Sequence, residues 1–215
     1  MVLKQLIKNA KKYIETVAFQ DKWRKKNTDN STKAGNIFPV DKVSIGKHTY
    51  GTLNVHCYNQ PEEHLSIGAY CSVADNTWFM LGGEHDYKTL MTYPFKNRIT
   101  KNEIQEAITK GPIIVDDDVW IGCNCVILSG THIGQGAVIG AGSVVSGNVP
   151  PYAIFAGGRI VKYRFKPEVI EKLLNFDPKL IQWDKVKAKM DVLYTHIDEE
   201  NVEQVLEQVK SIQED

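Results

Sequence analysis

The chain has 215 residues, with 26 basic and 26 acidic side chains, so its formal net charge is zero and nothing indicates a nucleic-acid partner. That length suits one domain with appendages. The four cysteines include no CxxC pair, and small buried thiols are the simplest interpretation of Cys71 and Cys125. Because no apolar run is long enough for a signal peptide or a membrane span, we expect a cytoplasmic protein.

The first part of the chain, residues 1–35, is predicted to be a helix followed by a linker. Apolar residues recur at helical spacing over residues 2–18, with four lysines on the opposite side. Such a helix could lie on a membrane surface. We favour the alternative, in which it lies against one end of the following domain. Residues 27–36 are polar and rich in turn formers, which is typical of a linker.

Residues 36–165 are predicted to form the main domain, and its early part shows an irregular repeat. Aliphatic or aromatic residues occur six apart at Ile67, Val73 and Phe79. The same phase then reaches residues that do not fit: His85, Met91, Asn97, Glu103 and Thr109. We therefore predict that residues 82–111 leave the repeat as one long excursion loop, and long ordered loops are usually functional.

A strict repeat of six then runs from residue 115 to residue 149. One set of positions is aliphatic: Val115, Ile121, Ile127, Ile133, Ile139 and Val145. A second set is small or β-branched: Val119, Cys125, Thr131, Ala137, Ser143 and Val149. Neither the helical period nor simple alternation produces a six-residue repeat, whereas a β-solenoid does. Three hexads would close one triangular coil, so residues eighteen apart should stack. Gly122, Gly134 and Gly140 follow aliphatic positions, where a Cβ would crowd the corner.

The repeat should end at Pro150-Pro151, because proline cannot continue a ladder of strands. From residue 166 to residue 215 the pattern becomes helical. Because a solenoid needs covered ends, we predict that these helices form a C-terminal cap.

With these motifs, the sequence resembles the hexapeptide-repeat acyltransferases, and within them the branch of xenobiotic and polysaccharide O-acetyltransferases. The resemblance covers roughly residues 36–166, including Val119-Trp120-Ile121-Gly122. It implies a mainly β fold, a left-handed parallel β-helix with an excursion loop and helices at both ends. It also implies acetyl-CoA as co-substrate, no metal cofactor, and a homotrimer with active sites between subunits.

The resemblance makes His85 the general base of the reaction. An alcohol is a poor nucleophile at neutral pH, and imidazole is suited to take its proton. Glu84 stands where the family often has asparagine, so the group that orients the imidazole stays open between Glu84 and Asp86. Tyr50, Asn54 and Glu84 are the candidate substrate-binding residues.

The cofactor-binding candidates also follow from the resemblance. Trp120 would lie beside the pantetheine arm, and Cys123, Ala141 and Ser146 would let the arm approach the coil. Arg159 and Lys162 would hold the phosphates, provided that an Asn-Pro-Ala segment of the family is absent here.

The function predicted from the sequence is direct transfer of an acetyl group to a hydroxyl of a sugar, a polysaccharide precursor or an antibiotic, with a small preference for the saccharide. N-acylation of an amino sugar is the alternative within transferases. A metalloenzyme like the γ-type carbonic anhydrases ranks low, because the chain has no HxxxxH pair. A purely structural or binding solenoid is disfavoured by the excursion and its histidine.

Overall fold

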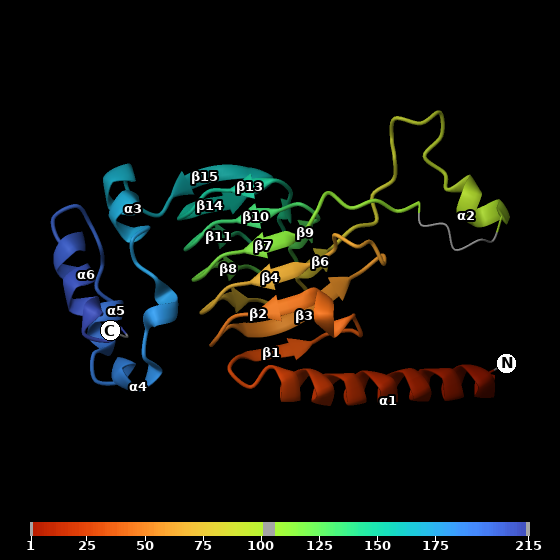
Figure 1. Cartoon of the computed structure of the whole chain (residues 1–215), viewed down its shortest axis with the longest axis horizontal. Coiled ribbons are helices and arrows are strands. Elements are labelled where there is room, and N and C mark those ends of the chain that lie inside the picture. Colours follow the sequence, from red (N-terminus) through yellow and green to blue (C-terminus); the bar gives the residue numbers. More distant parts are fainter. Residues whose placement is uncertain (1, 101–105, 214–215) are drawn as a thin grey trace.

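The computed structural model describes residues 2–100 and 106–213 and is mainly β (Figure 1). Its short strands stack in parallel along three faces around one apolar core, and the stacking direction is vertical in Figure 1. This arrangement fits a β-helix. No helix among the described residues has both the length and the apolar character needed to cross a membrane.

Each face is a ladder of strands from successive coils. The first face contains β1 (Ser31–Ala34), the start of β3 (Tyr50–His56), β5 (Ser72–Val73), β8 (Trp120–Ile121), β11 (Val138–Ile139), β14 (Ala153–Ala156) and β15 (Arg159–Tyr163). The second contains the end of β3, then β6 (Trp78–Met80), β9 (Val126–Leu128) and β12 (Val144–Val145). The third contains β2 (Val43–Ile45), β4 (Leu65–Ile67), β7 (Ile113–Val115), β10 (His132–Ile133) and β13 (Asn148–Val149).

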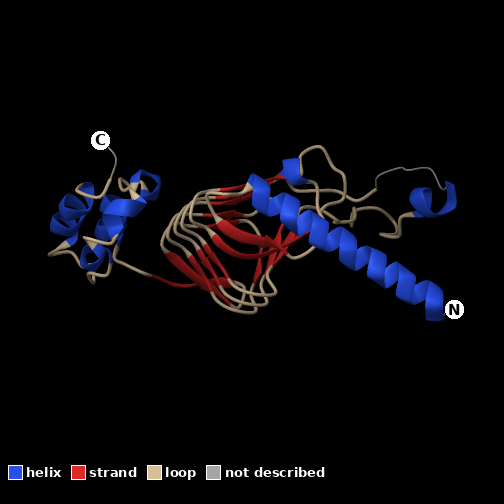
Figure 2. Cartoon of the chain, turned by 90° about the horizontal axis from the view of Figure 1, so that it is seen from below, coloured by secondary structure: helices blue, strands red, loops and turns tan. Residues whose placement is uncertain are grey.

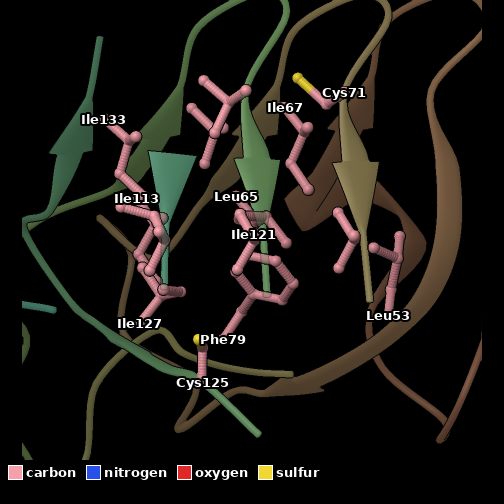
Figure 3. Packing of buried hydrophobic residues seen from close by; sticks show 14 of the residues in the cluster. Leu53, Leu65, Ile67, Cys71, Phe79, Ile113, Ile121, Cys125, Ile127 and Ile133 are labelled. Carbon is pink, nitrogen blue, oxygen red and sulfur yellow. The ribbon is translucent and has the colours of Figure 1, made fainter. Parts of the chain in front are cut away.

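The predicted stacking at eighteen residues is confirmed by the strand pairing. Ile133 pairs with Val115, Ile139 with Ile121, and Val145 with Ile127. All twelve residues of the two ladders are buried, and the aliphatic side chains fill the space between the faces (Figure 3). Burying one such aliphatic side chain stabilises the fold by about 1.5–3 kcal/mol.

The corners between faces use a third set of positions that the sequence analysis did not single out. Five residues six apart, each just before a small-ladder residue, have positive φ: Asp118, Asn124, Gly130, Gly136 and Gly142. Glycine, asparagine and aspartate tolerate this backbone better than other residues. The crowding predicted at Gly122 is also present, because a Cβ there would lie 2.6 Å from the backbone nitrogen of Ala141.

Two predictions about the edges of the repeat are wrong. The expected linker contains β1, which pairs in parallel with β3. The two prolines do not stop the ladder either, because β14 pairs in parallel with β11 beyond them. The last coil is simply shorter, and Ile154 pairs with Val138, sixteen residues earlier.

The helices lie outside the coil. They are α1 (Val2–Lys26), α2 (Phe95–Thr100), α3 (Pro167–Leu173), α4 (Trp183–Val186), α5 (Met190–Leu193) and α6 (Val202–Lys210), with 3-10 turns at Val40–Lys42 and Pro178–Leu180. The excursion between β6 and β7 contains α2. Glu103, one of the positions out of phase, lies outside the described residues.

The predicted C-terminal cap is wrong in its position. Helices α3 to α6 lie beside the stack rather than over its end (Figures 1 and 2). They contact the corner between the third and first faces at successive coils. Lys179 forms an ion pair with Asp117 at 3.0 Å, and Tyr70 donates a hydrogen bond to the carbonyl of Ile181. The ring of Trp183 stacks on His48 at 4.2 Å between centroids.

Helix α1 crosses the N-terminal end of the stack (Figure 2). Only its last turns contact the coil, where Trp23 is fully buried and its indole N–H donates to Thr32 Oγ1 at 3.0 Å. The apolar residues at positions 2–18 are exposed instead. Helix α1 thus lies at one end of the domain, but its apolar stripe does not pack there.

Candidate active site

The excursion is anchored to the coil at its base by hydrogen bonds. Glu84 and Ile108 form an antiparallel bridge. The hydroxyl of Ser129 donates to Glu84 Oε1 at 2.6 Å and accepts from the backbone N–H of Lys110 at 3.0 Å. The second carboxylate oxygen, Glu84 Oε2, is buried and has no hydrogen-bond partner among the described residues. A buried carboxylate oxygen without a partner is costly.

His85 follows this anchor and is exposed on the excursion. Its Nδ1 lies 2.6 Å from the backbone carbonyl oxygen of Thr92. A carbonyl oxygen can only accept, so Nδ1 must carry the proton in this contact. In the neutral imidazole Nε2 then has the free lone pair, which is the state that a general base requires. Thr92 therefore orients the ring; neither Glu84 nor Asp86 makes this contact.

Tyr50 and Trp120 share a line of outward positions on the first face. Tyr50 pairs with Ser72, and Ser72 pairs with Trp120, so two strand spacings of roughly 10 Å in total separate their backbones. The Trp120 side chain is 56% exposed although its neighbours along the strand are buried. An exposed indole on a flat sheet is a surface that a ligand or another chain can cover.

Arg159 and Lys162 lie at the far end of the same face. Strands β14 and β15 form an antiparallel hairpin whose turn, Gly157-Gly158, has positive φ at both residues. Arg159 pairs with Ala156 and Lys162 with Ile154, because a bulge opposite Ile154 shifts the register. In a regular strand, residues three apart would point to opposite sides, but the bulge puts both cations on the outer side. Among the described residues, neither forms an ion pair.

Cys123 and Ala141 occupy successive corners between the first and second faces. Both are exposed, and the N–H of Gly142 donates to the carbonyl of Cys123 at 2.8 Å. Their side chains are small, so a thin substrate arm can approach the backbone closely at this corner.

Asn54 and Ser146 lie on the second face. Asn54 pairs with Trp78 and donates to the carbonyl of Thr77 at 3.0 Å. The exposed Ser146 directly follows β12, at the end of this face where the excursion leaves the coil. The rings of His56 and Trp78 lie 4.9 Å apart here and form an exposed aromatic surface. Trp78 was not among the residues predicted from the sequence. Because the ladder residues on either side of it are buried, its side chain must point outward.

The predicted residues therefore fall into two groups. Tyr50, Trp120, Arg159 and Lys162 lie on the first face, and Cys123 and Ala141 continue from it around one corner. Asn54, Ser146, Glu84 and His85 belong to the second face and the excursion at its far end. The base and the two cations thus lie on different sides of one chain.

Burial leaves three of the four thiols poor nucleophiles. It raises the pKa of Cys57 to about 11 and that of Cys71 to about 12, and it also raises the pKa of Cys125. Cys123 is exposed. In the part of the chain that the structure describes, no group of three or more His, Cys, Asp or Glu side chains is placed to hold a metal ion.

A cavity of about 730 Å³ lies elsewhere, between the C-terminal helices and the corner of the coil that they cover. It is lined mainly by apolar side chains, with Asp118 and Arg164 among its polar groups. None of the predicted site residues lines it.

Comparison with known proteins supplies the class. The model of the bacterial transferase hexapeptide family, with six repeats, matches residues 112–147. A probable macrolide acetyltransferase from Lysinibacillus sphaericus is 36% identical in an alignment of 131 positions that covers 57% of this chain and 72% of that protein. A chloramphenicol acetyltransferase from Klebsiella aerogenes is 34% identical in an alignment of 171 positions that covers 70% of this chain and 81% of that protein.

A solved structure of a maltose O-acetyltransferase from Clostridium difficile 630 has the same fold, with a TM-score of 0.50 and 23% identity over 64% of this chain and 67% of that one. The chain belongs to the hexapeptide-repeat transferases. Within that family it is an acetyltransferase, as the sequence predicts.

Proposed function

We propose that this protein transfers an acetyl group from acetyl-CoA directly to a hydroxyl of a small acceptor, with His85 as general base. The observation that carries the proposal is the contact between His85 Nδ1 and the Thr92 carbonyl, which leaves Nε2 free to accept a proton. His85 would take the hydroxyl proton as the acceptor oxygen attacks the thioester carbonyl. When the tetrahedral adduct collapses, the imidazolium would return that proton to the leaving thiolate.

The first face suits the donor. Trp120 offers an exposed aromatic surface to the pantetheine arm, and the small corner residues Cys123 and Ala141 leave room beside it. At the end of the face, Arg159 and Lys162 are exposed on the same side of the hairpin without ion-pair partners among the described residues. Two such cations match the phosphates of coenzyme A. Ser146 lies away from this face, so it would serve a cofactor held by another copy.

The acceptor would bind near the base of the excursion. Glu84 would position the acceptor at the base of the excursion, and Asn54 lies on the face below. Tyr50 lies on the first face, so it would contact an acceptor bound to another copy. The same carboxylate would also hold an ammonium group, so N-acylation of an amino sugar stays the alternative. Among the acceptors predicted from the sequence, the relatives named for macrolides and chloramphenicol favour the antibiotics over the saccharide.

The separation of the two groups supports a trimer with shared sites. The excursion extends away from the coil in Figure 1, and its apolar residues are exposed: Tyr87, Leu90, Met91, Tyr93, Phe95 and Ile99. An apolar loop tip of this kind needs a covering surface. In a closed ring of three left-handed coils, each excursion would reach the first face of a neighbour and bring His85 to its Trp120.

The proposal is tested by release of the free thiol from acetyl-CoA with a panel of sugars, amino sugars, chloramphenicol and macrolides. Turnover with a hydroxyl acceptor, and an ester in the product by mass spectrometry, would support it. An amide product would favour N-acylation, and no turnover with any acceptor would overturn the assignment of hydroxyl acceptors.

Mixed trimers test the shared site. His85→Ala subunits are unfolded and refolded together with subunits that carry Arg159→Ala and Lys162→Ala. If one site takes its base and its phosphate contacts from different chains, some mixed sites are fully wild type and activity returns. Mixtures no more active than the separate variants would show that one chain supplies both.

A further inference from the structure

Residues 2–18 of α1 form an amphipathic helix whose apolar side has no partner among the described residues. The exposed apolar residues on this stripe are Val2, Leu3, Leu6, Ile7, Tyr13, Ile14 and Val17, each at least 46% exposed. At 100° per residue they cover roughly half of the helix circumference. The lysines occupy the other half, at positions 4, 8, 11 and 12.

The apolar stripe points away from the coil. Helix α1 contacts the coil through Phe19 and Trp23, whose rings both lie 5.1 Å from the ring of Phe38. The centre of the stripe is about 150° around the helix from these two contact residues. In Figures 1 and 2 the helix is straight, extends beyond the coil and runs across the direction in which the strands stack. The stripe therefore faces outward at the N-terminal end, where the chain's own core cannot bury it.

The charge of the helix distinguishes the possible partners of the apolar stripe. The helix contains eight basic and two acidic residues. Because basic and acidic residues balance over the whole chain, acidic residues outnumber basic ones outside this helix. Two ion pairs within the helix, Lys11 to Glu15 at 3.9 Å and Lys25 to Asp21 at 2.6 Å, stabilise little because their side chains are exposed. A second copy of the helix would meet the same positive charge, whereas a surface of anionic lipid complements it.

We propose that α1 binds the surface of a membrane that contains anionic lipid. Its axis would lie in the plane of the membrane, with Leu6, Ile7 and Ile14 among the acyl chains and the lysines at the level of the headgroups. The coil would stand on the other side of α1, with its strands stacked away from the membrane. This role is independent of the acetyl transfer proposed above, because the stripe contains no residue of the candidate active site.

The test uses the full-length protein and sedimentation with vesicles of pure phosphatidylcholine or of phosphatidylcholine with 30% phosphatidylserine. The wild type is expected to bind the mixed vesicles and to dissociate as salt increases. Replacing the lysines at positions 4, 8, 11 and 12 by glutamine should weaken binding by up to about 600-fold, since each basic residue near the surface contributes about fivefold. Leu6→Gln with Ile14→Gln should weaken it at least about 100-fold.

A matched control exchanges two side chains on the polar half of the helix, Gln5→Asn with Asn9→Gln, and should bind like the wild type. All these positions are exposed, so the variants should keep the unfolding temperature and the turnover of a soluble acceptor. Equal binding to pure phosphatidylcholine, or no binding to either vesicle, would overturn the proposal. A fall in the oligomeric mass of the Leu6 and Ile14 variant, measured by light scattering, would show that the stripe packs on a second copy and would also overturn it.

Discussion

His85 can be changed in a way that separates its two roles on the excursion. In His85→Asn, the side-chain amide nitrogen lies as many bonds from the backbone as Nδ1 does in histidine. It can therefore still donate to the carbonyl of Thr92, but the variant has no second nitrogen to act as a base. In His85→Ala, both the hydrogen bond and the base are lost.

The two losses have different expected sizes. Loss of a general base lowers kcat by about 10²- to 10⁴-fold, and this should be seen in both variants. The hydrogen bond to Thr92 is one neutral contact worth about 0.5–1.5 kcal/mol. If it orders the excursion for catalysis, His85→Ala should lose a further factor of about 2 to 13 in kcat/KM relative to His85→Asn.

The assay is thiol release with saturating acetyl-CoA. His64→Asn is the matched control, because the His64 ring belongs to the third face, where its Nε2 lies 3.2 Å from Ser44 Oγ, and is not part of the excursion. Its activity should equal that of the wild type, and all three variants should bind acetyl-CoA with unchanged affinity in a calorimeter.

Wild-type turnover in His85→Asn would refute the reasoning, because that variant cannot accept the hydroxyl proton. Equal kcat/KM for His85→Asn and His85→Ala would refute the orienting role of Thr92 while leaving the base in place.

Two further predictions concern the cofactor and the C-terminal helices. Changing Arg159 and Lys162 together to alanine should raise the KM for acetyl-CoA more than it lowers kcat, because such contacts are equal in the ground and transition states; initial rates at varied acetyl-CoA check this. Burial, and then Lys47, lower the pKa of His48 below its ordinary value of 6.5. As the pH falls, His48 is therefore protonated in the unfolded chain before it is protonated in the folded one. The free energy of unfolding should fall as the pH drops below about 6.5. His48→Asn should show a shallower fall in unfolding temperature from pH 7.5 to pH 5.5.

Each of these predictions has a control and a contrary outcome. Lys185→Ala with Lys187→Ala removes two exposed cations of the C-terminal segment and should leave the KM unchanged. If both double variants shift the KM equally, the effect belongs to overall charge and not to the hairpin. For His48, asparagine tolerates the positive φ of 61° at this position. A variant that loses as much stability on acidification as the wild type would show that another group titrates.

The sequence alone determined the faces of the coil and the place where the coil is left. Whether a residue in a short strand points inward or outward is a local property of the strand period, so Ile127 and Cys125 could be placed in the core without coordinates. The break of phase after Phe79 likewise located the excursion. His85 and Trp120 were found as single residues, through their motifs.

Only the tertiary structure decided which distant segments contact one another, because the strand period does not specify such contacts. Pro150 and Pro151 looked like a stop, but a coil of sixteen residues accommodates them in a corner and pairing with β11 continues. The direction of the stripe on α1, the position of the C-terminal helices beside the stack, and the bulge that puts Arg159 and Lys162 on one side all depend on contacts between distant segments. Such contacts are chosen by the packing of the whole chain, and no local pattern of residues encodes them. The orienting group of His85 could not be read from side chains either, because it is a backbone carbonyl that any residue at position 92 would supply.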